Sequence, residues 1–316
     1  MPGHKRNKAL LGIELPYDLD ITEIDGFDDL HHADGILKEE QERAARVFGA
    51  EESHFLVNGS TAGILSAVMG CTHRGDKILV ARHCHKSIYH AIYMNGLVPR
   101  YVYPEFDISM HMNGEISKED VAKALAAEPD IKAVVIVSPN YDGVVSDVKG
   151  IAEVAHSYRI PLIVDEAHGP HFGFHPAFPG RANDLGADVV INSLHKTLPS
   201  LTQTAILHIN GKIVNRRRIK KYLHMLQSSS PSYIFMASLD ACVDFVDGKC
   251  ENAFDLYVER LQKFREELEP LQHLQILRTE HYDISKVVIS TANANITSPE
   301  LADRLRKEYH LEMEMT

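Results

Sequence analysis

The chain has 316 residues, 44% of them hydrophobic, which is enough for the core of one large domain and part of a second. Its 33 Lys and Arg against 44 Asp and Glu give a net charge of −11, which disfavours nucleic acids and anionic membranes as partners and favours cationic substrates. The four cysteines have no paired spacing, no apolar run approaches membrane-spanning length, and the N-terminus lacks a signal-peptide core. We therefore expect a cytoplasmic protein with reduced thiols.

The first 45 residues are expected to form an extended arm and an entry helix. Turn-forming residues at 25–29 precede the segment 37–47, in which apolar residues recur with the period of a helix.

Residues 46–245 show an alternation of short β-rich runs with helical stretches. The helical stretches include 117–127 and 148–158, and 216–245 is expected to be mostly helical. The β-rich runs lie at 78–81, 100–103, 133–137, 162–164, 189–191 and 204–207. This alternation predicts an α/β domain with a mostly parallel, seven-stranded type of sheet and helices on both of its faces.

Residues 246–316 are interpreted as the start of a smaller α+β domain. We expect a helix at 256–268, a strand at 286–290, a helix at 299–309 and a further strand at 312–316. Because the chain stops inside this last strand, the second domain is expected to be truncated.

An aspartate and a lysine each follow a buried strand of the predicted sheet. Asp165 comes directly after the apolar run 160–164, and Lys196 comes shortly after 187–191. Both side chains should therefore emerge at the sheet edge where open α/β folds bind ligands. Pyridoxal phosphate needs such a pair, an amine for a Schiff base and a carboxylate for the pyridinium nitrogen. The alternatives are a solvated surface lysine and a turn aspartate.

A glycine turn followed by hydroxyl side chains indicates a phosphate site. Gly59, Ser60 and Thr61 lie between an apolar run and a helical one, so backbone N–H groups at a helix N-terminus would face the phosphate. Ser193 and His195 could add hydrogen bonds. Serine and threonine also cap helices where no ligand is bound, so this signal is weak by itself.

Histidines near the same edge have several interpretations. His85 follows the run 78–81 and could lie flat on a cofactor ring, or could be a hydrogen-bonded loop histidine. His168 is interpreted as packing beside the cofactor under Asp165. With His171 and His175 it could form a zinc site, but no fourth ligand is evident, so no metal is expected.

Asn140 and Tyr141 close another predicted strand, and either could line the pocket. Turn chemistry explains this string of residues equally well.

With these residues in place, the chain resembles the major domain of the bacterial ornithine/lysine/arginine decarboxylases, which are pyridoxal-phosphate enzymes of the aspartate-aminotransferase fold. The matching strings occur in family order and cover nearly the whole chain. They are residues 2–5, 34–36, 58–61, 84–87, 165–168, 193–196 and 228–239.

The resemblance implies decarboxylation of lysine, arginine or ornithine to the corresponding amine and CO2, with pyridoxal 5′-phosphate as cofactor. It implies that Lys196 forms the Schiff base, Asp165 meets the ring nitrogen, and His85 and Ala167 contact the two faces of the ring. The phosphate would be held by Ser60, Thr61, Ser193 and His195. The resemblance also implies a homodimer, or an oligomer of dimers, in which the string 228–232 reaches the neighbour's site.

Two other functions stay open. Cofactor residues alone do not decide which bond at Cα breaks, so an aminotransferase or another lyase of this fold is an alternative. No arginine is evident for a second substrate carboxylate, which disfavours transamination. Members of the family carry residues before the first matching string and a further C-terminal domain, so both ends look clipped and an inactive cofactor-binding fragment is the other alternative.

Overall fold

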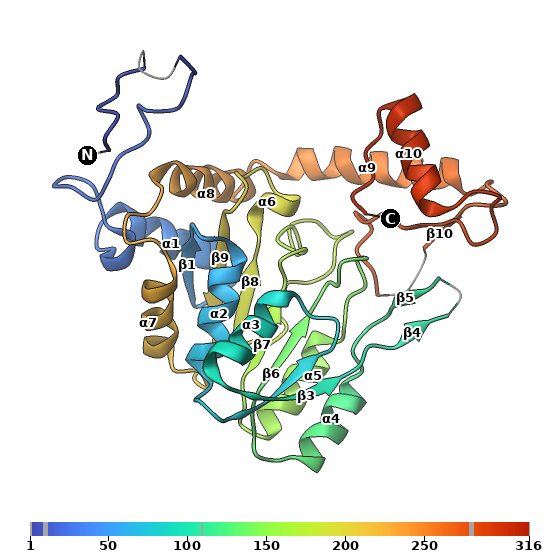
Figure 1. Ribbon diagram of the computed structural model, residues 1–316, viewed down its shortest axis with the longest axis horizontal. Helices are drawn as coiled ribbons and strands as arrows, with labels where there is room; N and C mark the ends of the chain where they lie inside the picture. The colour runs from blue at the N-terminus through green and yellow to red at the C-terminus, as the bar shows by residue number, and fades with distance from the viewer. Residues whose placement is uncertain (1, 9–11, 109, 278–280, 316) are drawn as a thin grey trace.

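A seven-stranded sheet forms the centre of the protein in the computed structural model, which describes residues 2–8, 12–108, 110–277 and 281–315 (Figure 1). The strand order is β1-β9-β8-β7-β6-β2-β3, and β9 runs antiparallel to both of its neighbours while the other pairs are parallel. The strands are β1 (Glu52–Leu56), β2 (Lys77–Ala81), β3 (Val98–Val102), β6 (Ile131–Val137), β7 (Leu162–Asp165), β8 (Val189–Asn192) and β9 (Ala205–Ile209).

Helices cover both faces of this sheet. α2 (Gly59–Cys71), α3 (Lys86–Asn95) and α7 (Arg216–Leu226) share one buried cluster with the sheet, and α4 (Lys118–Ala127) and α5 (Val148–Ser157) share the other. The predicted α/β architecture is confirmed.

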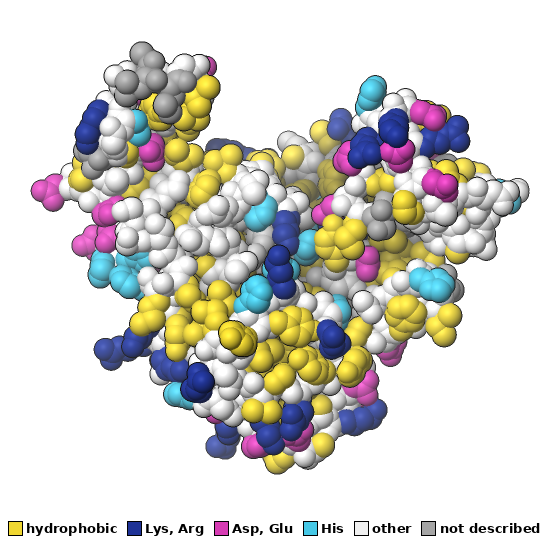
Figure 2. Space-filling model, in the orientation of Figure 1, with side chains coloured by type: hydrophobic (Ala, Val, Ile, Leu, Met, Phe, Trp, Pro, Cys, Tyr) yellow, Lys and Arg dark blue, Asp and Glu magenta, His cyan; other side chains and the backbone are white. Residues whose placement is uncertain are grey.

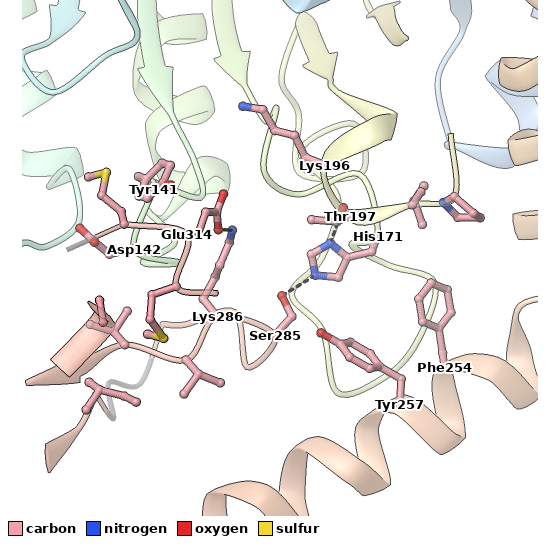
Figure 3. Close-up of a pocket in the computed structure, with 18 of the residues that line it drawn as sticks. Tyr141, Asp142, His171, Lys196, Thr197, Phe254, Tyr257, Ser285, Lys286 and Glu314 are labelled. Carbon is pink, nitrogen blue, oxygen red and sulfur yellow. Dashed lines mark hydrogen bonds and ion pairs between the residues drawn. The ribbon is translucent and has the colours of Figure 1, made fainter. Parts of the chain in front are cut away.

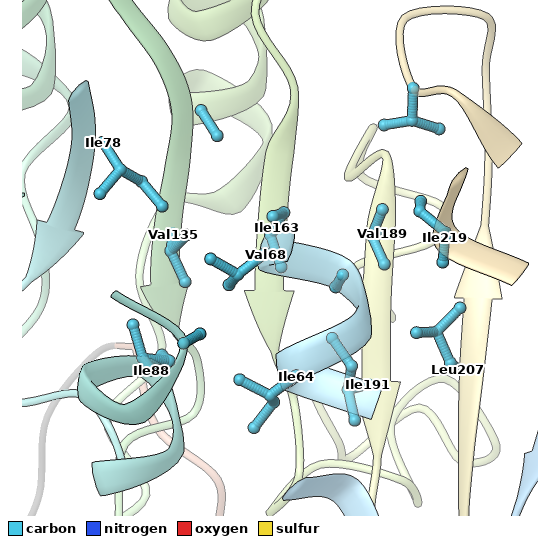
Figure 4. Packing of buried hydrophobic residues seen from close by; sticks show 14 of the residues in the cluster. Ile64, Val68, Ile78, Ile88, Val135, Ile163, Val189, Ile191, Leu207 and Ile219 are labelled. Atoms are coloured by element: carbon cyan, nitrogen blue, oxygen red, sulfur yellow. The ribbon is translucent and has the colours of Figure 1, made fainter. Parts of the chain in front are cut away.

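Alternation along the strands explains why two cores form. In β8, Val189 and Ile191 pack with α2 in one cluster, whereas Val190 packs in the cluster on the opposite face. Figure 4 shows Ile64 and Val68 of α2 packed over the sheet. Both faces of the strands are therefore apolar, which is why they read as continuous hydrophobic runs.

Each predicted β-rich run overlaps an observed strand, and the predicted helices are present. The helical region expected at 216–245 is interrupted, because α7 ends at Leu226 and α8 (Tyr233–Val246) begins after Ser232, whose side chain caps it. Pro231 lies in the break, and the residue before a proline is disfavoured in helical conformation.

The remaining elements lie outside the central sheet. A 3-10 turn, η1, lies near the N-terminus, and short α6 follows β8; α9 and α10 come later in the chain. The bounds are η1 (Leu30–His32), α1 (Ile36–Val47), β4 (Phe106–Asp107), β5 (Met112–Asn113), α6 (Leu194–Thr197), α9 (Glu251–Leu268), β10 (Gln275–Ile276), β11 (Ile289–Ser290) and α10 (Ser298–Tyr309). None of the described helices combines the length and apolar character needed to cross a bilayer.

Two expectations for the C-terminal part are corrected. The strand predicted at 286–290 is reduced to β11, which pairs with β10. The strand predicted at 312–316 is wrong for its described part, because 312–315 form neither helix nor strand. Glu312 and Glu314 are exposed there and pair with no neighbouring strand in the described chain, so alternation alone does not make a strand. The division at residues 45 and 245 stays a prediction.

The closest helix packing involves Gly70 of α2 and Ile219 of α7. A Cβ atom at Gly70 would lie 2.6 Å from Ile219 Cγ1 and 2.8 Å from Ile219 Cα, so backbone would have to move. We expect Gly70→Ala to lower the free energy of unfolding by about 1–3 kcal/mol in urea denaturation. Gly180→Ala is the control, because its nearest neighbour would be Leu185 Cδ1 at 3.8 Å. Equal stability of the two variants would refute the packing argument.

Candidate active site

The residues singled out from the sequence converge at the carboxyl edge of the sheet. Asp165 is the last residue of β7, and Lys196 lies in α6, immediately after β8. His85 follows β2 and caps the N-terminus of α3. These strands run parallel, so their ends meet at one edge, which is where ligands bind in open α/β sheets.

Asp165 is a buried carboxylate, with 3% of its surface exposed. Burial raises its pKa to about 6, although the charge of Lys196 and a hydrogen bond from the Ala167 N–H at 3.2 Å act in the opposite direction. Burial disfavours the charged form of a carboxylate, and the attraction of an adjacent cation offsets this penalty. A buried carboxylate therefore favours a cationic neighbour. The protonated ring nitrogen of pyridoxal phosphate is a cation of this kind.

Lys196 has the environment of a nucleophilic amine. Desolvation lowers its pKa and the positive charge of Lys286 lowers it further, while Asp165 and Glu314 raise it. The side chain still reaches solvent through the cavity described below, so the desolvation is partial. A lowered pKa increases the share of neutral amine, which is the form that attacks a carbonyl carbon.

His168 holds the Lys196 amine directly, with 2.9 Å between Lys196 Nζ and His168 Nε2. Burial lowers the pKa of His168 to about 3, and the charges of Lys196 and Lys286 act in the same direction, so the ring is neutral. The tautomer assigned from this contact has its hydrogen on Nδ1 and accepts a hydrogen bond from Lys196 at Nε2. His168 Nδ1 is buried and has no hydrogen-bond partner among the described residues.

A small cradle of donors lies at the N-terminus of α2. Ser60 Oγ and Ser193 Oγ are 2.6 Å apart, and Gly59 has a φ of +73°, which a glycine adopts without strain. The N-cap residue Asn58 makes no side-chain bond to the helix, so the first N–H groups of α2 are left for another acceptor. Hydroxyls and N–H groups at a helix N-terminus suit a phosphate.

His195 and His85 are each held in place by a neighbour. His195 Nδ1 lies 2.9 Å from the Thr204 carbonyl oxygen, which fixes the imidazole ring. His85 Nδ1 lies 2.8 Å from Ser87 Oγ, and burial together with the charge of Lys196 lowers the pKa of His85. His85 is therefore a neutral, oriented ring at the same edge as Lys196.

A cavity of about 840 Å³ opens on one side of Lys196 (Figure 3). Its other charged lining residues are Asp142, Lys286 and Glu314, together with the aromatic ring of Tyr141. Asp165, Ser60 and Ser193 do not line the cavity, so it lies on a different side of Lys196 from these residues.

Of the two residues that the sequence suggested as pocket residues after β6, Tyr141 lines the cavity and Asn140 does not. The Tyr141 ring lies edge-on to His168 with 5.2 Å between ring centroids. Asn140 is buried instead. It donates to the Asn113 carbonyl at 2.9 Å and accepts from the Val144 N–H.

Several lining residues were missed by sequence reasoning. The cavity is bordered by His171, Ser285, Lys286 and Glu314. Asp283 does not border it but is hydrogen-bonded to His171. Asp283 lies 112 residues from its partner His171. No local spacing signals such a pair; the one available hint was a lysine at the start of the predicted strand 286–290.

The zinc alternative finds no geometric support in the three histidines. His168 contacts Lys196, whereas His171 lies between Thr197 and Asp283. His175 Nε2 lies 3.1 Å from the Asp255 carboxylate. Within the described parts of the chain, no three His, Cys, Asp or Glu side chains gather in a metal-binding group.

Asp165→Asn is expected to stabilise the cofactor-free protein at neutral pH. The folded pKa of about 6 lies above the usual value of 3.8, so ionisation destabilises the fold as pH rises between these values. The variant's free energy of unfolding should exceed the wild type's by roughly 1–3 kcal/mol near pH 7.5 and by about 0.5 kcal/mol near pH 4. Urea denaturation at both pH values measures this, and a gain that does not depend on pH would contradict it.

Comparison with known proteins agrees with this geometry. The family model for the Orn/Lys/Arg decarboxylase major domain matches residues 14–294. The uncharacterized protein YaaO of Bacillus subtilis is 46% identical over 229 residues, covering 72% of this chain and 48% of YaaO. An arginine decarboxylase of Halalkalibacterium halodurans is 35% identical over 331 aligned positions, covering 100% of this chain and 67% of that enzyme.

A solved structure extends the agreement to the fold. Lysine decarboxylase A from Pseudomonas aeruginosa superposes with a TM-score of 0.81 at 24% identity, covering 94% of this chain and 49% of that chain. This chain thus spans about half to two thirds of the length of these proteins. From the family match and the arrangement of the site, the chain belongs to the Orn/Lys/Arg decarboxylase family, whose major domain it carries.

Proposed function

We propose that this protein decarboxylates a basic L-amino acid with pyridoxal 5′-phosphate as cofactor. The observation that carries the proposal is the pairing of Lys196 with the buried carboxylate of Asp165, beside the Ser60–Ser193 cradle. The family match supports it, and so do relatives named arginine decarboxylases that align with the whole chain.

The residues at the sheet edge fit this cofactor. A bound pyridoxal phosphate supplies an electron sink for the electron pair that remains at Cα when CO2 leaves. The proposed contacts are Lys196 at the aldehyde carbon, Asp165 at the ring nitrogen, His85 and Ala167 on the ring faces, His168 beside the ring, and Gly59, Ser60, Thr61, Ser193 and His195 around the phosphate.

His168 is the residue that we expect to orient the amine of Lys196. Its Nε2 atom lies 2.9 Å from Lys196 Nζ, and its pKa of about 3 keeps the ring neutral in the resting protein. A neutral Nε2 accepts a hydrogen bond from Lys196 Nζ and so orients the amine, while the lowered pKa of Lys196 itself provides the neutral, nucleophilic form. The buried Nδ1–H stays available for a further hydrogen bond at the site.

The charges of the cavity support a cationic substrate. The carboxylates of Asp142 and Glu314 border the space beside Lys196, where they can face the distal cation of a basic amino acid. Arginine is the substrate that we expect first, because the named arginine decarboxylases are 34–35% identical over the whole chain, whereas Escherichia coli lysine decarboxylase is 28% identical over 82% of it.

Incubating the purified protein and cofactor with arginine, lysine and ornithine separately tests the function. We expect CO2 and the matching amine from at least one of them, and no product from Lys196→Ala. Formation of a 2-oxo acid in place of the amine would make the protein an aminotransferase. Cofactor binding without any product would make it an inactive cofactor-binding fragment.

Lys196 should carry the cofactor covalently. After addition of pyridoxal phosphate and reduction with borohydride, peptide mapping is expected to place a stable pyridoxyl group on Lys196, because its pKa is lowered and it lies beside Asp165. Lys286, which lines the same cavity, and Lys86, which follows His85, serve as internal controls. A label mainly on either of them would disprove the assignment.

We also propose a homodimer, in which the string 228–232 contributes to a shared site. Three hydroxyls of this string have partners in their own chain: Ser228 Oγ donates to the Ser230 carbonyl oxygen at 3.1 Å, Ser230 Oγ donates to Glu23 Oε1 at 3.3 Å, and Ser232 caps α8. The string nevertheless lies at the phosphate cradle, because the Ser228 N–H donates to Asn58 Oδ1 at 3.2 Å.

Exposed apolar side chains give the dimer independent support. Figure 2 shows apolar side chains gathered on the face that carries α3 and β3. Tyr93 is 87% exposed and Tyr103 is 65% exposed in this region. Apolar surface of this kind is typical of contacts between subunits.

Mixing two defective chains tests the shared site. Lys196→Ala and a variant with Ser228, Ser229 and Ser230 changed to alanine should each lose most activity, and the mixture should recover part of it, since a mixed dimer rebuilds one intact site. Sedimentation before mixing checks that each variant is dimeric. A monomeric protein with full activity, or dimers without recovery, would refute the shared site.

A further inference from the structure

Lys286 places a cation in the cavity of Lys196 without a role in the function proposed above. It follows Asp283 in the C-terminal segment 281–288, and its side chain is 16% exposed. Its Nζ atom lies 5.7 Å from the centroid of the Tyr141 ring, which contacts His168, the direct neighbour of Lys196. Two aromatic rings, those of Tyr141 and His168, therefore connect Lys286 with the proposed reacting amine.

The surroundings of Lys286 show that its position accepts a carboxylate. Glu314 Oε2 lies 3.4 Å from Lys286 Nζ, and Figure 3 shows the Lys286 side chain extending toward Glu314 and Tyr141. An ammonium group has three donors, and Glu314 provides the one ion pair found for it among the described residues. Lys286 also lines the cavity of about 840 Å³, where a second carboxylate can approach it.

A buried hydrogen bond holds the segment that carries Lys286. His171 Nε2 lies 3.2 Å from Asp283 Oδ1, and the two side chains are 2% and 0% exposed. Ser285 Oγ donates to Asp283 Oδ2 at 2.7 Å, while His171 Nδ1 lies 3.1 Å from Oγ1 of Thr197, the residue after Lys196. We call these four residues, His171, Asp283, Ser285 and Thr197, the clasp. The clasp connects the segment 281–288 to α6, which carries Lys196.

We propose that Lys286 binds the α-carboxylate of the substrate, and that the His171–Asp283 clasp positions it to do so. The inference rests on the proposed function, since it assumes an amino acid in this cavity. In a free amino acid the α-carboxylate lies next to the α-amine, which reacts close to Lys196. Lys286 is the other lysine that lines this cavity, so it is the cation placed to bind that carboxylate. The carboxylate of Asp142, which also lines the cavity, then remains for the distal cation of the substrate.

Arginine and agmatine separate this role from general binding, because they differ only in the carboxylate. Binding is measured by calorimetry in a Lys196→Ala background with pyridoxal phosphate, so that no ligand is consumed. With Lys286 intact, arginine should bind about ten- to a hundredfold more tightly than agmatine, as expected for a hydrogen bond to a charged group. Lys286→Ala should reduce this ratio to about one, and Lys286→Arg should restore most of it.

Lys118→Ala is the matched control, because Lys118 pairs with Asp147 at a similar 3.3 Å but borders a different pocket. It should leave the ratio unchanged. A ratio that survives Lys286→Ala overturns the role of Lys286 and leaves the proposed function standing. If neither ligand binds to the chain with Lys286 intact, the proposed function itself fails, and this inference fails with it.

The clasp is tested by Asp283→Asn, which should lower the ratio as Lys286→Ala does and also speed chymotryptic cleavage at Tyr282. Asp255→Asn, which removes the partner of the more exposed His175, should change neither result. If Asp283→Asn fails to fold, Ser285→Ala weakens the same clasp more mildly. A folded clasp variant with an unchanged ratio and unchanged cleavage would overturn the positioning role.

Discussion

The burial of the Asp165 carboxylate is the constraint on which the rest of the site depends. With 3% of its surface exposed, it loses most of its hydration, and burial is the dominant influence on its pKa. The Ala167 N–H and the nearby Lys196 compensate only in part, so the ionised form is destabilised without a further cation. A ligand with a protonated ring nitrogen would remove this penalty, and its binding would therefore stabilise the fold.

On the cavity side of Lys196 the excess charge is positive near the amine, because two lysines lie there. Lys196 and Lys286 line one cavity, and their charges also act on His168. Desolvation lowers the pKa of Lys196 and repulsion from Lys286 lowers it further, which increases the share of neutral, nucleophilic amine. Glu314 acts in the other direction. The cavity thus combines cations and carboxylates in a small volume, which suits a ligand that carries both signs of charge.

The two sides of the site come from different parts of the chain. The parallel sheet supplies the groups proposed to hold the cofactor, each at a strand end or a helix N-terminus, where the backbone is rigid. The segment around Asp283 supplies the far wall of the cavity, and the buried His171 side chain joins it to α6, which carries Lys196. Leaving one of these buried groups without its hydrogen-bond partner costs about 1–3 kcal/mol, so this junction also contributes to the stability of the fold.

Local pattern determined much of this protein, because the signals of a parallel sheet are local. A strand buried on both faces is a continuous apolar run, and the residue that follows it must lie at the carboxyl edge, so Asp165 and Lys196 could be paired from the sequence. The strand expected at 312–316 failed because a strand needs a neighbour, and alternation does not supply one. The His171–Asp283 pair and the place of Lys286 were decided only by the tertiary structure, since packing joins residues 112 positions apart and no sequence period records that contact.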